Sequence, residues 1–186
     1  MSVVKIISSL TEDVINNLRI GRRVLISGKI YTGRDAAHKR LVELIENGEP
    51  LPVNFDRQII YYAGPTPAKP GQVIGVAGPT TSGRMDVYTP KLLEQGLKGM
   101  IGKGKRSKEV IEAMKKYKAV YFAAVGGAAA LISKCIKKAE VVAYPDLGSE
   151  AIYCLEVEDF PAVVINDIFG GDLYEEGIKA YSEEGV

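Results

Sequence analysis

The sequence has 186 residues, 46% of them hydrophobic, so it is long enough to bury the core of one domain and too short for two domains of ordinary size. Its 24 basic side chains nearly cancel its 23 acidic ones, which excludes a global field that would recruit nucleic acid or an anionic membrane. One histidine and two cysteines are too few for an ordinary zinc site or a four-cysteine iron-sulfur cluster. With no signal peptide and no membrane-length apolar run, we expect a cytoplasmic protein with a single domain over 1–186 and no metal ligands of its own.

Hydrophobic periodicity and helix-capping residues predict strands and helices along the whole chain. In chain order the predicted elements are a strand at 3–8, a helix at 11–18 capped by Thr11, a strand at 23–31, a helix at 34–46, an extended stretch at 58–63, a buried strand at 73–77, a helix from Thr89 to about Gln95, an amphipathic helix at 107–117, a strand at 119–125, a helix at 128–136, strands at 151–157 and 162–165, and a helix at 173–182. Continuous apolar runs indicate strands buried on both faces, whereas alternation indicates half-buried ones. Both patterns occur in the sequence, which therefore predicts an α/β fold with a mixed sheet.

The segment Gly78–Asp86 concentrates hydrogen-bond donors after the predicted buried strand. It contains two glycines, a proline, the hydroxyls of Thr80, Thr81 and Ser82, and the guanidinium of Arg84. The glycines and proline favour an irregular backbone whose amides can converge on an anion, and a guanidinium can form two parallel hydrogen bonds with a carboxylate. The segment therefore indicates an anion-binding loop, the alternative being a capped turn between a strand and a helix. It is not a P-loop, because no Gly-Lys-Ser/Thr follows at the required spacing.

A second candidate lies at the predicted start of the helix at 34–46. Gly33 ends the preceding strand, and Arg34 and His38 are four residues apart, which places them on one helix face. The amides and dipole of a helix N-terminus favour an anion there, and His38 is the only side chain expected to titrate near neutrality. The alternative is a solvated helix face whose charged residues pair with their surroundings.

The segment Gly102–Ser107 is a glycine-spaced basic loop, in which Lys103 could reach the second carboxylate of a diacid. The alternatives are attraction of phosphate or nucleic acid, or a flexible charged loop. Interleaved aromatic residues, which a nucleic-acid stacking platform requires, are missing from it. Cys135 and Cys154 are expected to be buried packing residues, and the small residues at 126–130 to serve close helix packing.

Taken together, the segments at 32–40, 78–86, 102–104 and 148–152 resemble, in order and spacing, the beta subunit of class I iron-sulfur-dependent fumarate hydratases and L(+)-tartrate dehydratases. The resemblance covers nearly the whole chain. It implies a swivelling β/β/α domain of three layers. It also implies an alpha subunit that supplies three cysteines to a [4Fe-4S] cluster, so that the cluster is not bound by this chain.

The resemblance further implies the roles of the site residues. Thr80 would transfer a proton at the substrate, with His38 as a second catalytic residue or one that orients Arg34 or Asp35. The residues expected to bind a small dicarboxylate are Arg34, Thr81, Ser82, Gly83, Arg84 and Lys103. The implied reaction is hydration of fumarate to L-malate by a hetero-oligomer with the alpha subunit, with pairing of beta chains as a further option. No nucleic acid or membrane partner is expected.

Other functions remain compatible with the same residues. A tartrate dehydratase beta subunit would convert L-tartrate to oxaloacetate and water. A stand-alone module that binds phosphate metabolites or nucleotides would explain the glycine-rich loops without a partner, and a scaffold subunit with a relic site would retain them without activity. Because these alternatives differ in partner and ligand, titration with ligands and reconstitution with an alpha subunit separate them.

Overall fold

The structure is a computed structural model that describes residues 3–124 and 129–183. Its elements are β1 (Val4–Ile7), α1 (Glu12–Asn17), β2 (Arg23–Thr32), α2 (Asp35–Glu46), β3 (Ile59–Tyr61), the 3-10 helix η1 (Ser82–Met85), α3 (Thr89–Glu94), β4 (Gly99–Gly102), α4 (Lys108–Tyr117), β5 (Val120–Ala124), α5 (Ala129–Cys135), β6 (Ile136–Ala143), the 3-10 helix η2 (Pro145–Glu150), β7 (Ile152–Asn166) and α6 (Leu173–Glu183). No helix in these ranges is both long and apolar enough to cross a membrane.

The strands form a mixed sheet that closes on itself. β2, β3, β4 and β5 are parallel neighbours, β5 pairs antiparallel with β7, and β7 pairs antiparallel with β2 along most of its length. β1 adds a parallel strand beside β2, and β6 adds an antiparallel one beside β7. The predicted mixed sheet of an α/β fold is therefore confirmed.

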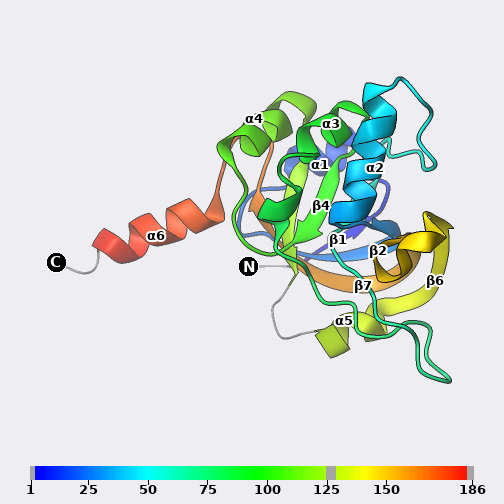
Figure 1. Cartoon of the computed structure of the whole chain (residues 1–186). Coiled ribbons are helices and arrows are strands. Elements are labelled where there is room, and N and C mark those ends of the chain that lie inside the picture. The colour runs from blue at the N-terminus through cyan, green and yellow to red at the C-terminus, as the bar shows by residue number, and fades with distance from the viewer. Residues whose placement is uncertain (1–2, 125–128, 184–186) are drawn as a thin grey trace.

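Two hydrophobic cores follow from the alternation of side chains along these strands. On β5, Phe122 belongs to a core shared with β2 and β7, whereas its neighbour Tyr121 belongs to the core beneath α2, α3 and α4. Residues 61 and 62, at and just beyond the end of β3, divide in the same way. Since successive side chains of a strand point to opposite faces, β3 and β5 have one core on each side. Figure 1 shows α2, α3 and α4 covering one side of the strands. The fold therefore has two layers of strands and one layer of helices.

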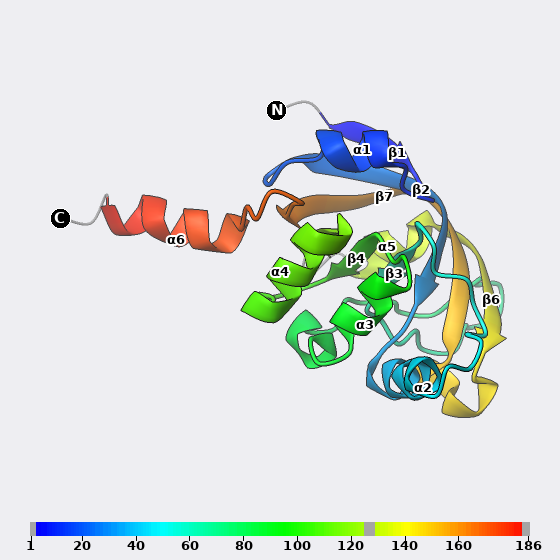
Figure 2. The same cartoon turned by 90° about the horizontal axis from the view of Figure 1, so that it is seen from above.

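The helix boundaries largely follow the predictions, because the capping residues were readable. Thr11 accepts a hydrogen bond from the Val14 amide at the start of α1, and Ser107 does the same for Val110 at the start of α4. Pro90 lies at the beginning of α3. Helix α6 projects away from the rest of the chain in both views (Figures 1 and 2).

The predicted buried strand at 73–77 is wrong. This segment belongs to an irregular arm, and Val73 and Val76 are more than half exposed. The arm folds back on itself, because the amide of Gly75 donates to the carbonyl of Thr66 and the amide of Thr66 to that of Val76. It lies beside α5, where Ser133 Oγ donates to the carbonyl of Gly75. The amides of Gly75 and Val76 donate to the carbonyl and hydroxyl of Thr66, so the segment pairs within the arm and not with a strand of the sheet.

The observed strands differ from the predicted ones in three further places. The two strands expected at 151–157 and 162–165 are one strand, β7, which continues through Pro161 with a bulge against β2 and a positive φ at Asp159. β4 and β6 were not predicted. The strand predicted at 119–125 and the helix predicted at 128–136 are present as β5 and α5, while the predicted positions 125–128 lie outside the described residues.

Candidate functional site

Three parallel strands, β2, β3 and β4, end on the same side of the sheet, and the predicted site segments follow them. The helix α2 begins just after β2 and the basic loop just after β4. The segment Gly78–Asp86 is brought to this edge by the end of β3, since the Thr80 amide donates to the Tyr62 carbonyl at 2.6 Å and Pro79 forms a bridge with Ala63. The carboxyl ends of parallel strands are where open α/β sheets usually bind ligands.

The backbone at the start of η1 is hydrogen-bonded to the backbone of the basic loop that follows β4. Thr81 bridges to Lys103, and the Ser82 amide donates to the Lys103 carbonyl at 2.9 Å. Thr81 and Lys103 are exposed and Thr80 is half-buried. Within the described residues, the side chains of all three have no hydrogen bond or ion pair, so they are free to meet a ligand.

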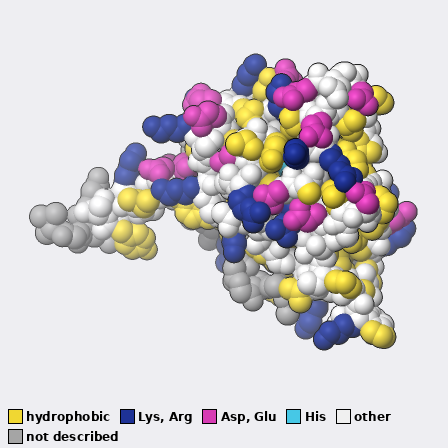
Figure 3. Space-filling model, viewed as in Figure 1, with side chains coloured by type: hydrophobic (Ala, Val, Ile, Leu, Met, Phe, Trp, Pro, Cys, Tyr) yellow, Lys and Arg dark blue, Asp and Glu magenta, His cyan; other side chains and the backbone are white. Residues whose placement is uncertain are grey.

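Both predicted arginines come together around acidic side chains at the start of α2. Arg84 Nε donates to Asp35 Oδ1 at 3.0 Å, and Arg34 Nη2 lies 4.0 Å from Asp35 Oδ2. Arg34 Nη2 also lies 3.5 Å from Glu150 Oε1. Figure 3 shows basic and acidic side chains interleaved on this face of the molecule. The arginines are therefore not part of a plain solvated helix face, although the outer residues Lys39 and Arg40 do pair with Glu43 and Asp146.

The side chain of His38 is fully buried rather than displayed on a solvated face. Its ring stands edge-on to Tyr62 and near Tyr88. The ring Nδ1 lies 2.8 Å from the Arg34 carbonyl, so Nδ1 carries the proton and Nε2, which is buried without a hydrogen-bond partner, does not. Burial lowers the pKa of His38 from 6.5 to about 4, so the ring is neutral at physiological pH and holds the backbone of Arg34.

Ser82 also faces inward. It is fully buried, and its hydroxyl is 2.9 Å from that of Tyr121, which donates to the Gly104 carbonyl. This contact requires glycine at position 102, where an added Cβ would lie 1.9 Å from Ser82 Oγ. Thus the structure brings Arg34, Thr80, Thr81, Gly83, Arg84 and Lys103 to one accessible edge, whereas the side chains of His38 and Ser82 support that edge from inside.

A buried ion pair, which sequence reasoning missed, ties the two loops together. Arg106 is 6% exposed, and its Nε donates to Asp86 Oδ1 at 2.7 Å. Its Nη2 donates to Thr89 Oγ1 at 2.8 Å, and Asp86 Oδ2 accepts from the Ser107 amide at 2.6 Å. Nothing in a run of basic residues distinguishes the one buried arginine. The only available signal was the Asp86 that ends the hydroxyl-rich segment.

The described residues do not fit an iron-sulfur cluster. Cys135 and Cys154 are free thiols on α5 and β7 and are half-buried, whereas buried packing residues were expected. Burial raises the pKa of both thiols. In the described ranges, no group of three or more histidine, cysteine, aspartate or glutamate side chains could hold a metal ion. Two separate thiols cannot supply the four cysteine ligands that a [4Fe-4S] cluster ordinarily takes.

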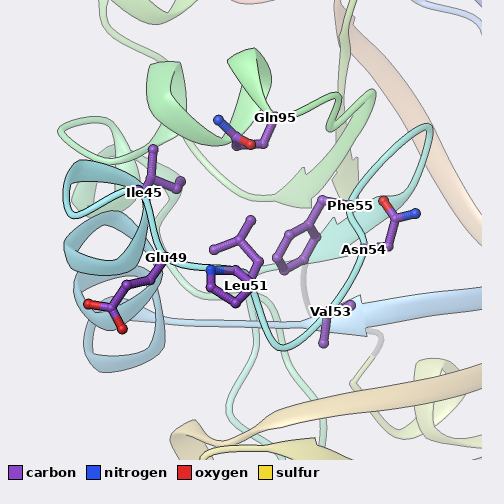
Figure 4. A pocket seen from close by; sticks show the side chains of 9 residues that line it. Ile45, Glu49, Leu51, Val53, Asn54, Phe55 and Gln95 are labelled. Carbon is purple, nitrogen blue, oxygen red and sulfur yellow. The ribbon is translucent and has the colours of Figure 1, made fainter.

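A hollow of about 410 Å³ lies at the far end of α2 from Arg34, beside Ile45, Leu51 and Phe55 (Figure 4). Its charged lining residue is Glu49, and neither lysine nor arginine lines it. It therefore does not suit an anionic ligand. The cationic edge at the start of α2 is the better candidate site, since two guanidiniums and an ammonium there can bind and orient carboxylates.

Comparison with known proteins gives consistent results along the chain. A family model described as "Fumarase C-terminus" matches residues 1–177. The chain is 44% identical to the aerobic class I fumarate hydratase of Escherichia coli K12 over 84% of its length, and 43% identical to fumarate hydratase 2 of Leishmania major over 83%. It is 38% identical over 95% of its length to a Methanocaldococcus jannaschii protein provisionally named L(+)-tartrate dehydratase subunit beta. The chain spans only 29% and 28% of those two fumarate hydratases, but 94% of that subunit.

Proposed function

The chain belongs to the fumarase C-terminus family, and from this premise we propose that it is the dicarboxylate-binding beta subunit of a two-subunit hydro-lyase that hydrates fumarate to L-malate. The observation that carries the proposal is the pair of arginines, Arg34 and Arg84, gathered at Asp35 beside the carboxyl ends of parallel strands. Fumarate and malate are small dianions with a carboxylate at each end. Two guanidiniums and the nearby ammonium of Lys103 match both ends.

The residues of this chain would bind and orient the substrate. Arg84 and Arg34 hold carboxylates through paired hydrogen bonds, and Lys103 completes the clamp. As negative charge builds up on the substrate carboxylate during the reaction, fixed cations offset it without having to reorganise. Thr81 and Gly83 are exposed residues of the same loop as Arg84 and would contact the substrate there.

We assign proton transfer at the substrate to the Thr80 hydroxyl, which is half-buried at the clamp and has no side-chain partner within the described residues. His38 and Ser82 are positioning residues in this proposal. The neutral ring of His38 fixes the backbone of Arg34, and the Ser82 hydroxyl anchors the η1 segment to Tyr121.

A [4Fe-4S] cluster, in this proposal, is held by an alpha subunit, because the described side chains of this chain do not form its ligand set. The beta chain is then inactive alone, and its clamp meets the remainder of the site across the subunit interface. Support for a separate partner comes from the relative that is named a subunit beta and has nearly the same extent as this chain.

The second candidate reaction is dehydration of L-tartrate to oxaloacetate. The same relative favours it, since the chain covers 94% of a protein provisionally named for tartrate dehydratase. L-Tartrate is also a dianion of similar length, so the clamp alone accommodates either substrate. Fumarate is preferred because the relatives with higher identity are named fumarate hydratases.

Anaerobic co-expression with the alpha subunit tests the proposal. We expect the purified complex to hydrate fumarate faster than it dehydrates L-tartrate, and the beta chain alone to show no iron absorbance and no turnover. Faster L-tartrate turnover would replace the first candidate with the second. A beta chain that binds a stoichiometric cluster by itself would contradict the division of the site.

Calorimetric titration separates the proposal from a stand-alone module that binds nucleotides or phosphate metabolites. We expect no tight binding of nucleotides to the isolated chain, because the loop after β3 lacks the Gly-Lys-Ser/Thr of a P-loop. Tight nucleotide binding without affinity of the complex for malate would remove the hydro-lyase from consideration. Full activity of the complex after Thr80→Ala and Arg84→Ala would instead indicate a relic site.

A further inference from the structure

The two arginines of the clamp each have an acidic partner within the chain. Asp35 lies between them, with Oδ1 3.0 Å from Arg84 Nε and Oδ2 4.0 Å from Arg34 Nη2. Glu150 Oε1 lies 3.5 Å from Arg34 Nη2, while Glu150 Oε2 accepts a hydrogen bond from the Ala36 amide at 3.1 Å. Three separate segments of the chain thus meet at one small group of charges: the start of α2, η1 and the end of η2.

The contact between Asp35 and Arg84 uses only one edge atom of the guanidinium. Asp35 Oδ2 is buried and accepts no hydrogen bond, so a second bond from a terminal nitrogen of Arg84 to this carboxylate is absent. Within the described residues the two terminal nitrogens of Arg84 have no other partner. Because the guanidinium is planar and rigid, a bond at Nε fixes the plane of the group and leaves its terminal pair pointing outward. That pair is the one that binds a carboxylate end-on.

Arg34 is held more tightly. An added Cβ at Gly64 would lie 2.9 Å from Arg34 Nη1 and 3.0 Å from its Cδ, so the backbone of residue 64 packs directly on the side chain. Only 24% of the Arg34 side chain is exposed, against 55% for Arg84. The orientation of Arg34 therefore depends on packing and on Glu150, whereas that of the looser Arg84 depends on its hydrogen bond with Asp35.

We propose that Asp35 and Glu150 are positioning residues, which hold the guanidiniums of Arg84 and Arg34 in the orientations that receive the two carboxylates of the substrate. This inference rests on the proposed function, because it takes the arginines to be the dicarboxylate clamp. Asp35 makes the larger contribution, since packing against Gly64 already restrains Arg34.

Removal of the Asp35 charge has two opposing effects. It leaves the site more positive, which attracts a dianion over a distance, and it weakens the hydrogen bond that orients the Arg84 side chain, since an amide oxygen is a weaker acceptor than a carboxylate, which weakens end-on binding. The first effect is screened by salt because Arg84 is more than half exposed, and the second is not. At physiological ionic strength the loss of orientation dominates. The net result is weaker substrate binding, and raising the salt concentration does not abolish it.

Steady-state kinetics of the co-expressed complex test the proposal with Asp35→Asn and Glu150→Gln, and Glu43→Gln as the matched control. Glu43 lies on the same helix in an exposed pair with Lys39. For Asp35→Asn we expect KM for fumarate to rise about tenfold, the scale of one hydrogen bond to a charged group, with a smaller change in kcat. Glu150→Gln raises KM less, and Glu43→Gln leaves KM unchanged. An unchanged KM in Asp35→Asn overturns the positioning role.

A double-mutant cycle distinguishes the proposed positioning role of Asp35 from a merely structural role at the start of α2. In an Arg84→Lys background, which lacks Nε of the guanidinium, Asp35→Asn should add little to the rise in KM. Equal effects of Asp35→Asn in both backgrounds contradict action through Arg84. Wild-type complex that turns over neither fumarate nor L-tartrate rejects the proposed function and the positioning role together, whereas active wild type with additive effects rejects only the latter.

A measurement on the isolated chain, without substrate, distinguishes a loss of positioning from poor assembly of a variant with the alpha subunit. In the ¹⁵N spectrum of the isolated chain, the Arg84 Nε–H signal is assigned by its disappearance in Arg84→Lys. We expect this signal to exchange slowly with solvent in the wild type and faster in Asp35→Asn, with the remaining amide spectrum preserved. Equal exchange in both proteins contradicts the contact on which the proposal rests.

Discussion

His38 illustrates how burial decides what a residue can do. Sequence position alone suggested a histidine that titrates near neutrality beside an anion site. Inside the core, however, the ring is neutral, because burial, together with the nearby positive charge of Arg106, lowers its pKa to about 4. A ring with that pKa does not change its charge near neutral pH. Its hydrogen bond to the Arg34 carbonyl gives it a supporting role instead.

The lowered pKa of His38 predicts a pH dependence of stability. In the unfolded chain the ring takes up a proton as the pH falls through 6.5, whereas in the folded chain it does so only near 4. Stability is therefore fully present above 6.5 and declines as the pH falls towards 4, by about 3 kcal/mol in total. Urea unfolding near pH 7 and near pH 4.5 measures it, and His38→Gln should flatten the difference. Since this is the only histidine, an imidazole NMR signal that titrates near 6.5 would contradict the burial.

The buried pair of Arg106 and Asp86 gives a second prediction at the residue level. Arg106→Met leaves the Asp86 carboxylate, 12% exposed, without its cation. We expect the free energy of unfolding to fall by about 3 to 5 kcal/mol, the usual consequence of stranding one partner of a buried pair. Equilibrium unfolding in urea measures the loss.

The control for Arg106→Met is Lys115→Met, which removes an exposed pair with Glu112 and should have little effect. Adding Asp86→Asn to Arg106→Met should recover part of the lost stability, because the stranded charge is then removed. Equal losses in Arg106→Met and Lys115→Met would show that the Arg106 pair does not hold the loops.

At the level of elements, glycine explains why β4 could not be predicted. Its sequence, Gly99 to Gly102, has two glycines in four residues, a composition depleted in strands. In the fold these glycines allow close approach, since a Cβ at Gly99 would lie 2.8 Å from Ile59 Cγ1 and one at Gly102 1.9 Å from Ser82 Oγ. Tertiary packing therefore overrides the intrinsic preference.

Two glycine-to-alanine substitutions with opposite outcomes test this account. Gly102→Ala places a methyl group against Ser82 and should lower the free energy of unfolding by about 1 to 3 kcal/mol, as overpacking does. Gly177→Ala lies in helix α6 with no atom within 4 Å of the new methyl, and should stabilise the helix by about 0.5 to 1 kcal/mol. Thermal unfolding and helical circular dichroism compare the two. A neutral Gly102→Ala would contradict the close contact between β4 and η1.

Helix starts were predictable where a capping residue or a proline marks them, as at Thr11, Pro90 and Ser107. The strands were predicted less accurately. β6 contains two lysines and lies at the edge of the sheet, so most of its side chains are exposed and no apolar pattern reveals it. β7 was predicted as two strands, because the alternation at 151–157 and the apolar run at 162–165 are separate patterns, whereas in the fold one strand continues across them with a bulge against β2.

Of the candidate site, the sequence indicated the basic side chains but not the acidic and buried groups that surround them in the fold. Arg34, Arg84 and Lys103 stand in conspicuous segments, and glycine and hydroxyl residues around them mark irregular loops. Asp35, Glu150 and Arg106 form their ion pairs with residues far away in the sequence. Such contacts leave no local pattern.

At the scale of the whole molecule, the clamp presents cations at one edge of the sheet, while the described residues contain no metal-binding cluster. The chain spans less than a third of the fumarate hydratases compared with it, yet nearly all of a relative named as a subunit. These facts fit a protein that contributes substrate binding to a site completed by another chain. We therefore propose that Arg84 and its neighbours bind the dicarboxylate within a two-subunit enzyme.

The most direct test is kcat/KM for fumarate in the anaerobically co-expressed complex, with Arg84→Met compared with Arg40→Met. Arg40 lies on α2 in an exposed pair with Asp146 and forms no ion pair with Asp35 or Glu150 among the described residues. Loss of two charge-assisted hydrogen bonds should lower kcat/KM of Arg84→Met by about 100-fold or more, whereas Arg40→Met should stay within about twofold of the wild type. Wild-type kcat/KM in Arg84→Met, with fumarate still the substrate, would contradict the claim that this chain supplies the dicarboxylate clamp.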